Sequence, residues 1–261
     1  MKSCRTAVTG LVLGLALVAG CSDDPPEAGP APDTDPSSQS VPPATPTGSG
    51  SPSPGTASPD VRGGTLPAGY LPLWPFSGPD EVRSVRPNGY ASWNLDAGRT
   101  ALSFTRSYLG FTSIDRVTSR SEKGNEARIG VGYKAEGGEH TAAVVHLFRM
   151  GEGGSGPWEV VGTDDTTLSL TTPAYGGRPA TPVTVGGRIT GVDESLQAKL
   201  LHPRAGEPLG EHCCTPAGGQ DTRWKLTLPY EGEVEEVATI VVWTGGHVAD
   251  VERFAVTGIR P

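Results

Sequence analysis

The most reactive side chains in this sequence stand four in a row: Glu211, His212, Cys213 and Cys214. Gly210 precedes them, so we expect a loop between two strands. The two cysteines could form a vicinal disulfide, although adjacent Cα atoms lie closer together than those of an ordinary disulfide. His212 and the two thiolates also suit a soft metal ion, but consecutive ligands rarely complete a tetrahedral site. A third interpretation gives the pair no function, and the sequence leaves all three open.

The cysteine count restricts how these thiols can pair. The chain has four cysteines, and the other two are Cys4 and Cys21. If Cys4 leaves with an N-terminal leader and Cys21 is modified, Cys213 and Cys214 can pair only with each other or with another molecule. No disulfide then joins separate parts of the chain, so we expect each folded region to have its own core.

The N-terminus has the pattern of a signal peptide. Lys2 and Arg5 precede an apolar run from Leu11 to Ala19, and small residues follow it. The run is far shorter than the roughly 20 residues that span a bilayer. We therefore predict a cleaved leader over residues 1–20 and a protein that is secreted across the membrane.

Leu17-Val18-Ala19-Gly20-Cys21 resembles the lipobox of bacterial lipoproteins. The resemblance implies cleavage before Cys21, a diacylglycerol on its thiol, and a further acyl chain such as palmitate on the new amino terminus. It places the protein on the extracytoplasmic face of the cell membrane, where two acyl chains are enough for stable anchoring. The alternative is an ordinary secretory signal that happens to end at a cysteine.

Residues 21–66 form a low-complexity segment rich in Pro, Ser, Thr, Gly and Ala. Such a composition buries too little apolar surface to offset the entropy of ordering a backbone. We predict a disordered tether with an end-to-end distance on the order of 40 Å.

Composition excludes some classes of partner. The 261 residues carry a formal charge of −8, and the pI is about 5.1. This acidity argues against nucleic acid as a partner and against electrostatic adsorption to anionic lipid. The 37 glycines and 25 prolines suit short strands and many turns.

The first folded region is predicted over residues 67–163. A proline-broken apolar stretch, 66–76, should form an extended strap. Asp96 is an expected helix N-cap, with apolar residues at helical spacing up to a stop at Gly110. Alternating strands are expected at 127–135, 141–150 and 158–162. One helix followed by antiparallel strands indicates an α+β domain.

The order of these elements loosely resembles the NTF2-like group of cone-shaped sheet domains. Such domains often hold a pocket between helix and sheet, and some are enzymes. The resemblance makes His146, Tyr133 and Asp115 the candidate acid–base residues. No second titratable residue has a spacing that places it beside His146, so we predict an ordinary strand histidine and no catalytic residue.

The second folded region, residues 164–261, has repeated short apolar runs separated by Gly, Pro and Asp. Strands are expected at 166–170, 182–189, 196–202, 222–228, 236–244 and 251–258. Short strands with turn signals between them and no helical period favour a β-sandwich. The predicted fold class is therefore mainly β with α+β: a small helix-plus-antiparallel-sheet domain followed by an immunoglobulin-like β-sandwich.

The stretch LSLTTPAYGGRPATPVTVGGRITG, residues 168–191, resembles the Gmad2 family, an immunoglobulin-like domain named from spore-germination proteins. Pro173, Gly176, Pro182, Val185 and Gly187 match its pattern. WKLTLPY, residues 224–230, fits the strand end of the family, whereas the last hairpin around residues 243–247 departs from it. The resemblance implies an extracytoplasmic binding or assembly module with no known catalytic residue.

These observations favour a non-enzymatic lipoprotein without a cofactor. Its expected partners are the cell membrane, through acyl chains on Cys21, and an envelope protein or wall polymer. A metal- or redox-responsive protein using His212, Cys213 and Cys214 is the alternative. A small hydrolase or isomerase with an NTF2-like pocket is a third hypothesis.

Overall fold

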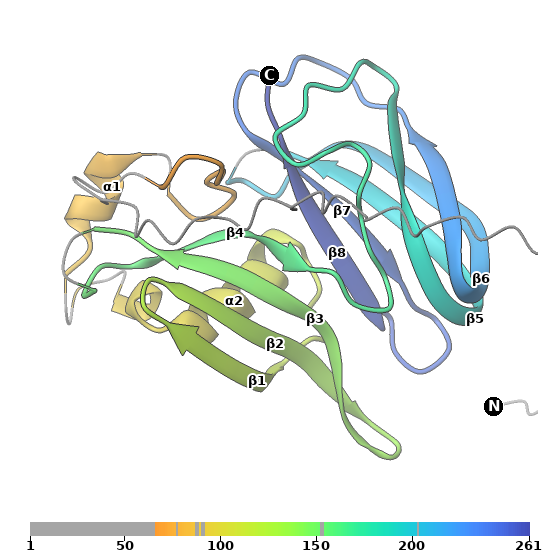
Figure 1. Ribbon diagram of the computed structural model, residues 1–261, viewed down its shortest axis with the longest axis horizontal. Coiled ribbons are helices and arrows are strands. Elements are labelled where there is room, and N and C mark those ends of the chain that lie inside the picture. Colours follow the sequence, from red (N-terminus) through yellow and green to blue (C-terminus); the bar gives the residue numbers. More distant parts are fainter. Residues whose placement is uncertain (1–65, 77, 87–88, 90–91, 152–153, 203) are drawn as a thin grey trace, which may run out of the picture. The chain divides into compact units, whose positions relative to one another are not determined.

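Two four-stranded antiparallel sheets and a few short helices make up the described part of the chain (Figure 1). The computed structural model describes residues 66–76, 78–86, 89, 92–151, 154–202 and 204–261. The predicted leader, Cys21 and the predicted tether up to residue 65 lie outside these residues. The described residues belong to one compact unit. The mainly β fold with a small helical part is therefore confirmed.

The first sheet has the strand order β1-β2-β3-β4. Its strands are β1 (Arg116–Lys123), β2 (Glu126–Ala135), β3 (Gly138–Arg149) and β4 (Trp158–Asp164). The strands predicted at 127–135, 141–150 and 158–162 are confirmed as β2, β3 and β4. The sequence analysis missed β1, because Val117 is its one large apolar residue and most of the strand is exposed. Without alternation of apolar residues, a strand leaves no period-two signal.

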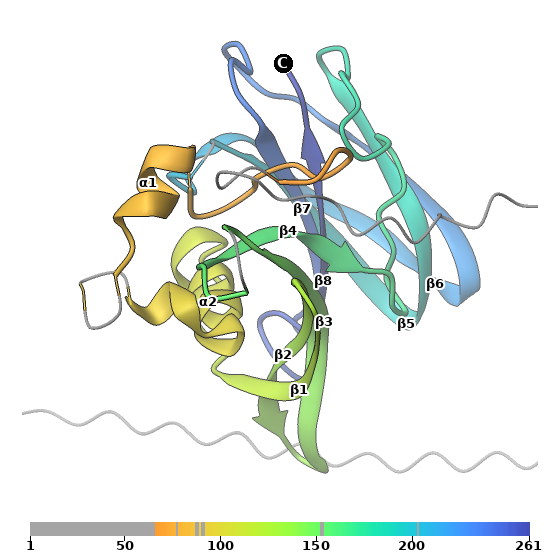
Figure 2. The same ribbon diagram turned by 60° about the vertical axis from the view of Figure 1, so that its left-hand side comes forward.

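Four short helical segments precede this sheet: α1 (Pro79–Ser84), η1 (Ser92–Leu95), α2 (Ala97–Ser103) and the π-helix η2 (Phe104–Tyr108). The predicted N-cap is confirmed, because Asp96 Oδ1 accepts a hydrogen bond from the Arg99 amide at 2.8 Å. The predicted stop is confirmed too, with Gly110 at a φ of +80°. α2 lies against one face of the sheet (Figure 2).

The strap predicted at 66–76 is extended and pairs with the edge of the first sheet. The Leu73 amide donates to Val160 O at 3.0 Å, and the Val160 amide donates to Trp74 O at 2.7 Å. The strap also contacts the second sheet, because a Cβ on Gly258 would lie 2.6 Å from a methyl carbon of Leu73. Glycine at 258 therefore permits the close approach of strap and strand.

The second sheet has the order β6-β5-β7-β8. Its strands are β5 (Val183–Leu201), β6 (Pro208–Leu228), β7 (Ala238–Thr244) and β8 (Arg253–Ile259). The prediction of separate strands at 182–189 and 196–202 is wrong, because both belong to β5. The loop expected at 211–214 is wrong too, since these residues belong to β6, where Glu211 and His212 pair with β5. β-Bulges absorb the turn residues that suggested breaks, so the ladder continues through them.

The β5–β6 hairpin bends in its middle, so that its two halves lie in different layers (Figures 1 and 2). The first half of β5 pairs with the second half of β6. At the other edge of β5, Leu168 forms a bridge with Ile189, and Thr172 forms one with Gly186. The second half of β5 pairs with β7. The core between the layers contains Leu168, Leu170, Val183, Val185, Ile189, Leu196, Ala198, Leu200, Trp224, Leu226, Leu228, Ala238, Ile240, Val242, Ala255 and Ile259. The immunoglobulin-like sandwich stays a prediction, because one hydrogen-bonded sheet supplies both layers.

A second core joins the two sheets. The Phe111 ring lies 5.4 Å from the rings of both Trp243 in β7 and Phe254 in β8. The Tyr108 hydroxyl donates to Thr239 Oγ1 at 3.2 Å, and burial raises its pKa to about 12. This shared core differs from the expectation that each region folds on a core of its own. The absence of a cross-linking disulfide does not exclude a shared core, since apolar contacts and hydrogen bonds join the two sheets here.

Candidate functional site

Cys213 and Cys214 lie exposed on β6, and their sulfur atoms are bonded to each other. His212 Nε2 lies 2.8 Å from Thr215 Oγ1. In this state neither cysteine offers a thiolate to a metal ion. The described ranges contain no group of three or more His, Cys, Asp or Glu side chains that could hold a metal.

The three residues suggested for acid–base chemistry do not form one site. His146 pairs with Arg128 across the β2–β3 ladder, whereas Tyr133 pairs with His140. Arg128, the partner of His146, and Tyr133 stand five positions apart along β2, a distance of roughly 17 Å. Asp115 is exposed and forms an ion pair with Arg116 at 2.8 Å, which lowers the pKa of its carboxyl group. No step that needs these three groups together can occur here.

His146 instead belongs to a polar cluster with Tyr70, Glu126, Arg128 and Asp164. Tyr70 donates to Glu126 at 3.0 Å, and Arg128 donates to Glu126 at 3.1 Å and to Asp164 at 2.8 Å. His146 Nε2 lies 3.7 Å from a Glu126 oxygen. Burial and then the Arg128 cation lower the pKa of His146, so the imidazole is neutral at pH 7. The charges of this cluster therefore pair with one another.

The space between α2 and the first sheet is filled. Phe104, Tyr108 and Trp158 are buried there, within one apolar core. Phe148 is buried elsewhere, against the Tyr70 ring at 5.5 Å between ring centroids. The NTF2-like pocket suggested by the sequence would need this space, and aromatic side chains occupy it.

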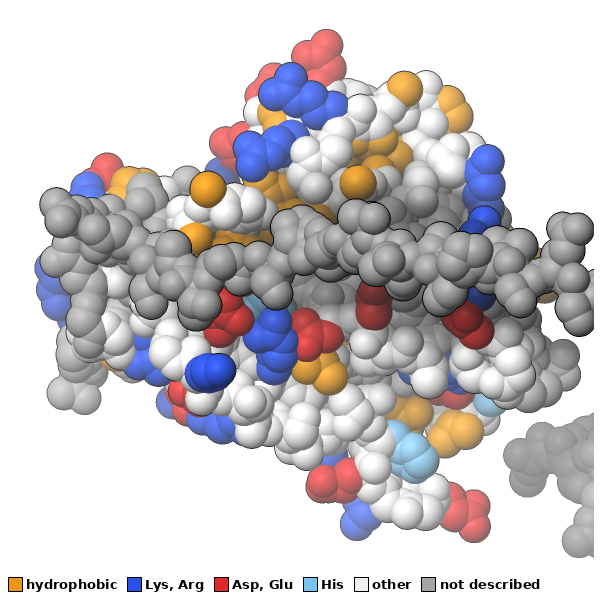
Figure 3. Space-filling model, viewed as in Figure 1, with side chains coloured by type: hydrophobic (Ala, Val, Ile, Leu, Met, Phe, Trp, Pro, Cys, Tyr) orange, Lys and Arg blue, Asp and Glu red, His pale blue; other side chains and the backbone are white. Residues whose placement is uncertain are grey.

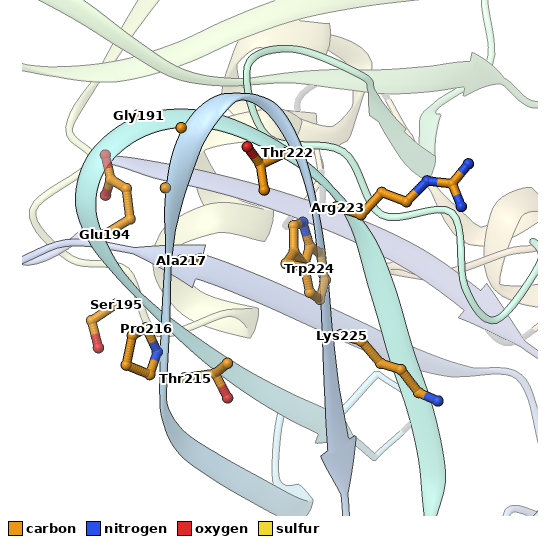
Figure 4. Close-up of a pocket in the computed structure, with 12 residues that line it drawn as sticks. Gly191, Glu194, Ser195, Thr215, Pro216, Ala217, Thr222, Arg223, Trp224 and Lys225 are labelled. Carbon is orange, nitrogen blue, oxygen red and sulfur yellow. The ribbon is translucent and has the colours of Figure 1, made fainter.

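A groove lies at the bend of the β5–β6 hairpin (Figure 4). We call it the β6 groove; its volume is about 930 Å³, which is within the range of ligand sites. It is lined by Gly191, Glu194, Ser195, Thr215, Pro216, Ala217, Gly218, Gly219, Thr222, Arg223, Trp224 and Lys225. Figure 4 shows the Trp224 indole between the two limbs of the β6 arch, with Arg223 and Lys225 pointing to the other side of the strand.

Glycines allow the hairpin to bend and leave the groove open. A Cβ on Gly191 would lie 2.5 Å from Glu194 Oε1, so only glycine admits the Glu194 side chain at this position. Gly219 has a φ of +110° in the opposite strand of the bend, a conformation that glycine adopts readily. Bulges at residues 189–194 add local curvature to β5.

Two buried polar atoms in the groove wall have no hydrogen-bond partner within the described residues. They are the indole nitrogen of Trp224 and the Oε2 oxygen of Glu194. The other oxygen of Glu194 pairs with Arg253. A buried donor or acceptor without a partner costs about 1–3 kcal/mol. A molecule that bonded to both atoms would recover this free energy.

Another groove among the described residues, of about 520 Å³, borders the same stretch of β6. Arg223, Trp224 and Lys225 line both grooves, and Thr172, Thr184 and Gly186 also border the second one. Arg223 and Lys225 are exposed. Arg188 beside them pairs with Asp221 at 2.6 Å, but Arg223 and Lys225 form no ion pair within the described ranges.

Trp224 lies on the buried face of β6 with Leu226 and Leu228, and the groove beside it was not predicted from the sequence. A signal was present in the alternating pattern of β5. Glu194 stands at the start of a series of inward positions that continues with Leu196, Ala198 and Leu200. A carboxylate on the core-facing side of a strand requires a partner, and such residues often mark functional sites.

Comparison with protein-family models, with curated proteins and with solved structures found no match to this chain. The lipoprotein, Gmad2 and NTF2-like resemblances therefore stay predictions. In the part that the structure describes, no helix is both long and apolar enough to cross a membrane.

Proposed function

We propose that this protein is a non-enzymatic binding protein of the cell envelope, anchored by acyl chains on Cys21. Its binding site is the β6 groove. The observation that carries this proposal is the presence of two buried, unpaired hydrogen-bonding atoms, from Trp224 and Glu194, in the wall of one groove.

The lining of the groove favours binding over catalysis. Its twelve residues include no histidine or cysteine, the usual general base and the strongest nucleophile. Glu194 is already paired with Arg253. Ser195 has no imidazole base among the lining residues, so the groove is equipped to hold a polar molecule without transforming it.

The distribution of charged and apolar side chains on the surface supports binding at one local site. Acidic and basic side chains are interspersed over the face shown in Figure 3. Tyr175 and Val248 are the two large apolar residues found exposed among those that the structure describes. Neither is a patch of the size that marks a protein interface, so a concave polar groove is the better candidate.

The anchor is tested by replacing its cysteine. Cys21→Ala should move the protein from the membrane fraction of cells to the soluble fraction, with Cys4→Ala as a control that stays with the membrane. If the Cys21→Ala protein remains in the membrane fraction, the lipid anchor is excluded.

The groove is tested by photo-crosslinking in cells. A photoreactive amino acid at Thr222, on the groove wall, should give a defined adduct. The same amino acid at Arg99, which is exposed on α2, should give none. Equal adducts from both positions, or none from Thr222, would contradict binding in the groove.

A further inference from the structure

We propose that the ligand of the β6 groove is an acidic glycan: an extended chain rich in hydroxyl groups that carries carboxylate or phosphate. This inference rests on the proposed binding function and adds the chemical class of the ligand. It follows from three properties of the two grooves that border β6.

The first property is the pair of unpaired atoms. Trp224 Nε1 can only donate a hydrogen bond, and an ionised Glu194 oxygen can only accept one. A sugar hydroxyl does both, so separate hydroxyls of an extended sugar chain can serve the two atoms. Both atoms are buried, so binding includes a small shift of the groove walls.

The second property is the mixture of hydroxyl and apolar groups in the lining. Ser195, Thr215 and Thr222 supply hydroxyls, whereas Pro216 and Ala217 supply an apolar wall. A sugar ring has the same two kinds of surface, with hydroxyls at its rim and C–H groups on its faces. A purely apolar ligand would leave the hydroxyls unpaired at a cost in affinity.

The third property is the charge beside the groove. Arg223 and Lys225 are exposed cations that form no ion pair within the described residues, in a chain of net charge −8. Both residues line the two grooves, so one extended ligand in these grooves would contact both. An extended chain with an anionic group beyond its first sugar fits this arrangement better than a single compact molecule.

Calorimetric titration of the full chain, purified in detergent, tests the ligand class. The probes are a neutral chitin pentamer, a galacturonate pentamer with carboxylates, and a glycerol-phosphate pentamer. At least one anionic probe should bind, with an affinity about tenfold above that of the chitin pentamer at low salt, and this advantage should disappear in 0.5 M salt. The galacturonate and glycerol-phosphate arms distinguish the two sources of charge. Equal affinity for all three probes, or no binding of any, would overturn the proposal.

Variants assign the effects to residues. Arg223→Gln with Lys225→Gln should weaken the anionic probe about tenfold and leave the neutral probe unchanged, whereas Lys123→Gln, an exposed cation on β1, should change neither. Trp224→Phe should weaken all probes about tenfold through the lost N–H donor. Because Trp224 is buried, Thr222→Val serves as a surface variant that keeps the fold and should also weaken all probes.

A direct readout comes from the indole N–H signals in NMR spectra of tryptophan-labelled protein. The Trp224 signal, assigned by its loss in Trp224→Phe, should shift on addition of the anionic probe. A shift confined to other tryptophans would contradict binding in the groove.

The adduct formed at Thr222 in cells separates the two proposals. A glycan adduct is sensitive to periodate, which cleaves neighbouring hydroxyls, and resists protease. A protease-sensitive adduct that resists periodate would keep the groove as a binding site but overturn the glycan. The absence of any adduct would overturn both.

Discussion

The first sheet and the β5–β6 hairpin both bury polar atoms without a hydrogen-bond partner, but these atoms have different surroundings in the two regions. On the first sheet, Arg128 pairs with Glu126 and Asp164, and the strap covers the cluster through Tyr70. At the bend of the hairpin, Trp224 Nε1 and Glu194 Oε2 are buried without partners in the wall of a groove. His146 Nε2 is also buried without a hydrogen-bond partner, but it lies within the charged cluster of the first sheet, whereas Trp224 and Glu194 line a groove. A reactive residue type is weaker evidence for a site than an unfilled hydrogen-bonding group beside open space.

The largest expected effect tests whether these two regions are energetically separate. Phe254→Ala in β8 removes a side chain that is 1% exposed and packs against Phe111. We expect the free energy of unfolding to fall by about 4 kcal/mol. Because the core is shared, hydrogen exchange should accelerate in β2 and β3 as well as in β7 and β8.

The matched control is Val248→Ala, since Val248 is 59% exposed; urea denaturation should show a change below about 0.5 kcal/mol. If Phe254→Ala accelerates hydrogen exchange only in β5 to β8, the two regions have independent cores and form two separate domains.

The helix N-cap and strands β2 to β4 of the first region could be predicted from the sequence because their signals are local. Asp96 caps a helix three residues away, and β2 and β3 alternate apolar and polar residues. β1 and the long β5 and β6 could not, because their continuity depends on cross-strand pairing. Residues such as Gly191 and Gly219 suggest a break when read along the chain, and permit a bend once their partners are known.

The candidate groove required the fold as well. Glu194 and Trp224 are 30 residues apart and become neighbours of one groove only because the hairpin folds back at its middle. The alternation of Trp224, Leu226 and Leu228 with polar residues indicates that Trp224 faces a core. It could not indicate that the core ends there and that the indole N–H has no partner.

A smaller effect concerns a buried carboxyl group in the first region. Glu159 on β4 is fully buried, and its Oε2 oxygen accepts a hydrogen bond from the Phe76 amide at 3.2 Å. Burial raises the pKa of Glu159 well above its usual value, so the folded protein keeps this proton to a higher pH than the unfolded chain does. The unfolded chain releases the proton above its ordinary pKa. Stability should therefore decrease as pH rises from that pKa toward the raised one.

Glu159→Gln removes this dependence while preserving the shape of the side chain. Above the ordinary pKa of a glutamate, we expect the free energy of unfolding of the unmodified protein to fall by up to about 1.4 kcal/mol per pH unit more steeply than that of the variant. Glu136→Gln, at an exposed glutamate of the β2–β3 turn, is the control and should leave the slope unchanged. If the free energy of unfolding depends on pH in the same way in the Glu159→Gln and unmodified proteins, Glu159 is ionised in the folded protein and the strap covers a charge.

The smallest effect concerns the disulfide beside the groove. Gln197 of β5 faces both Cys213 and Cys214, because the register shifts between Leu196 and Ala198. A link between adjacent residues restricts the unfolded chain little, so replacing both cysteines with serine should lower the free energy of unfolding by about 1 kcal/mol or less. The change should instead be local. Hydrogen exchange should accelerate at residues 215–217, the groove limb that follows the disulfide, and not in the first sheet. Thr118→Ser, at the register shift of β1, is the matched control and should leave that limb unchanged. A loss above about 3 kcal/mol would instead make the disulfide a support of the whole hairpin, and the groove would then be as rigidly built as the polar cluster around His146.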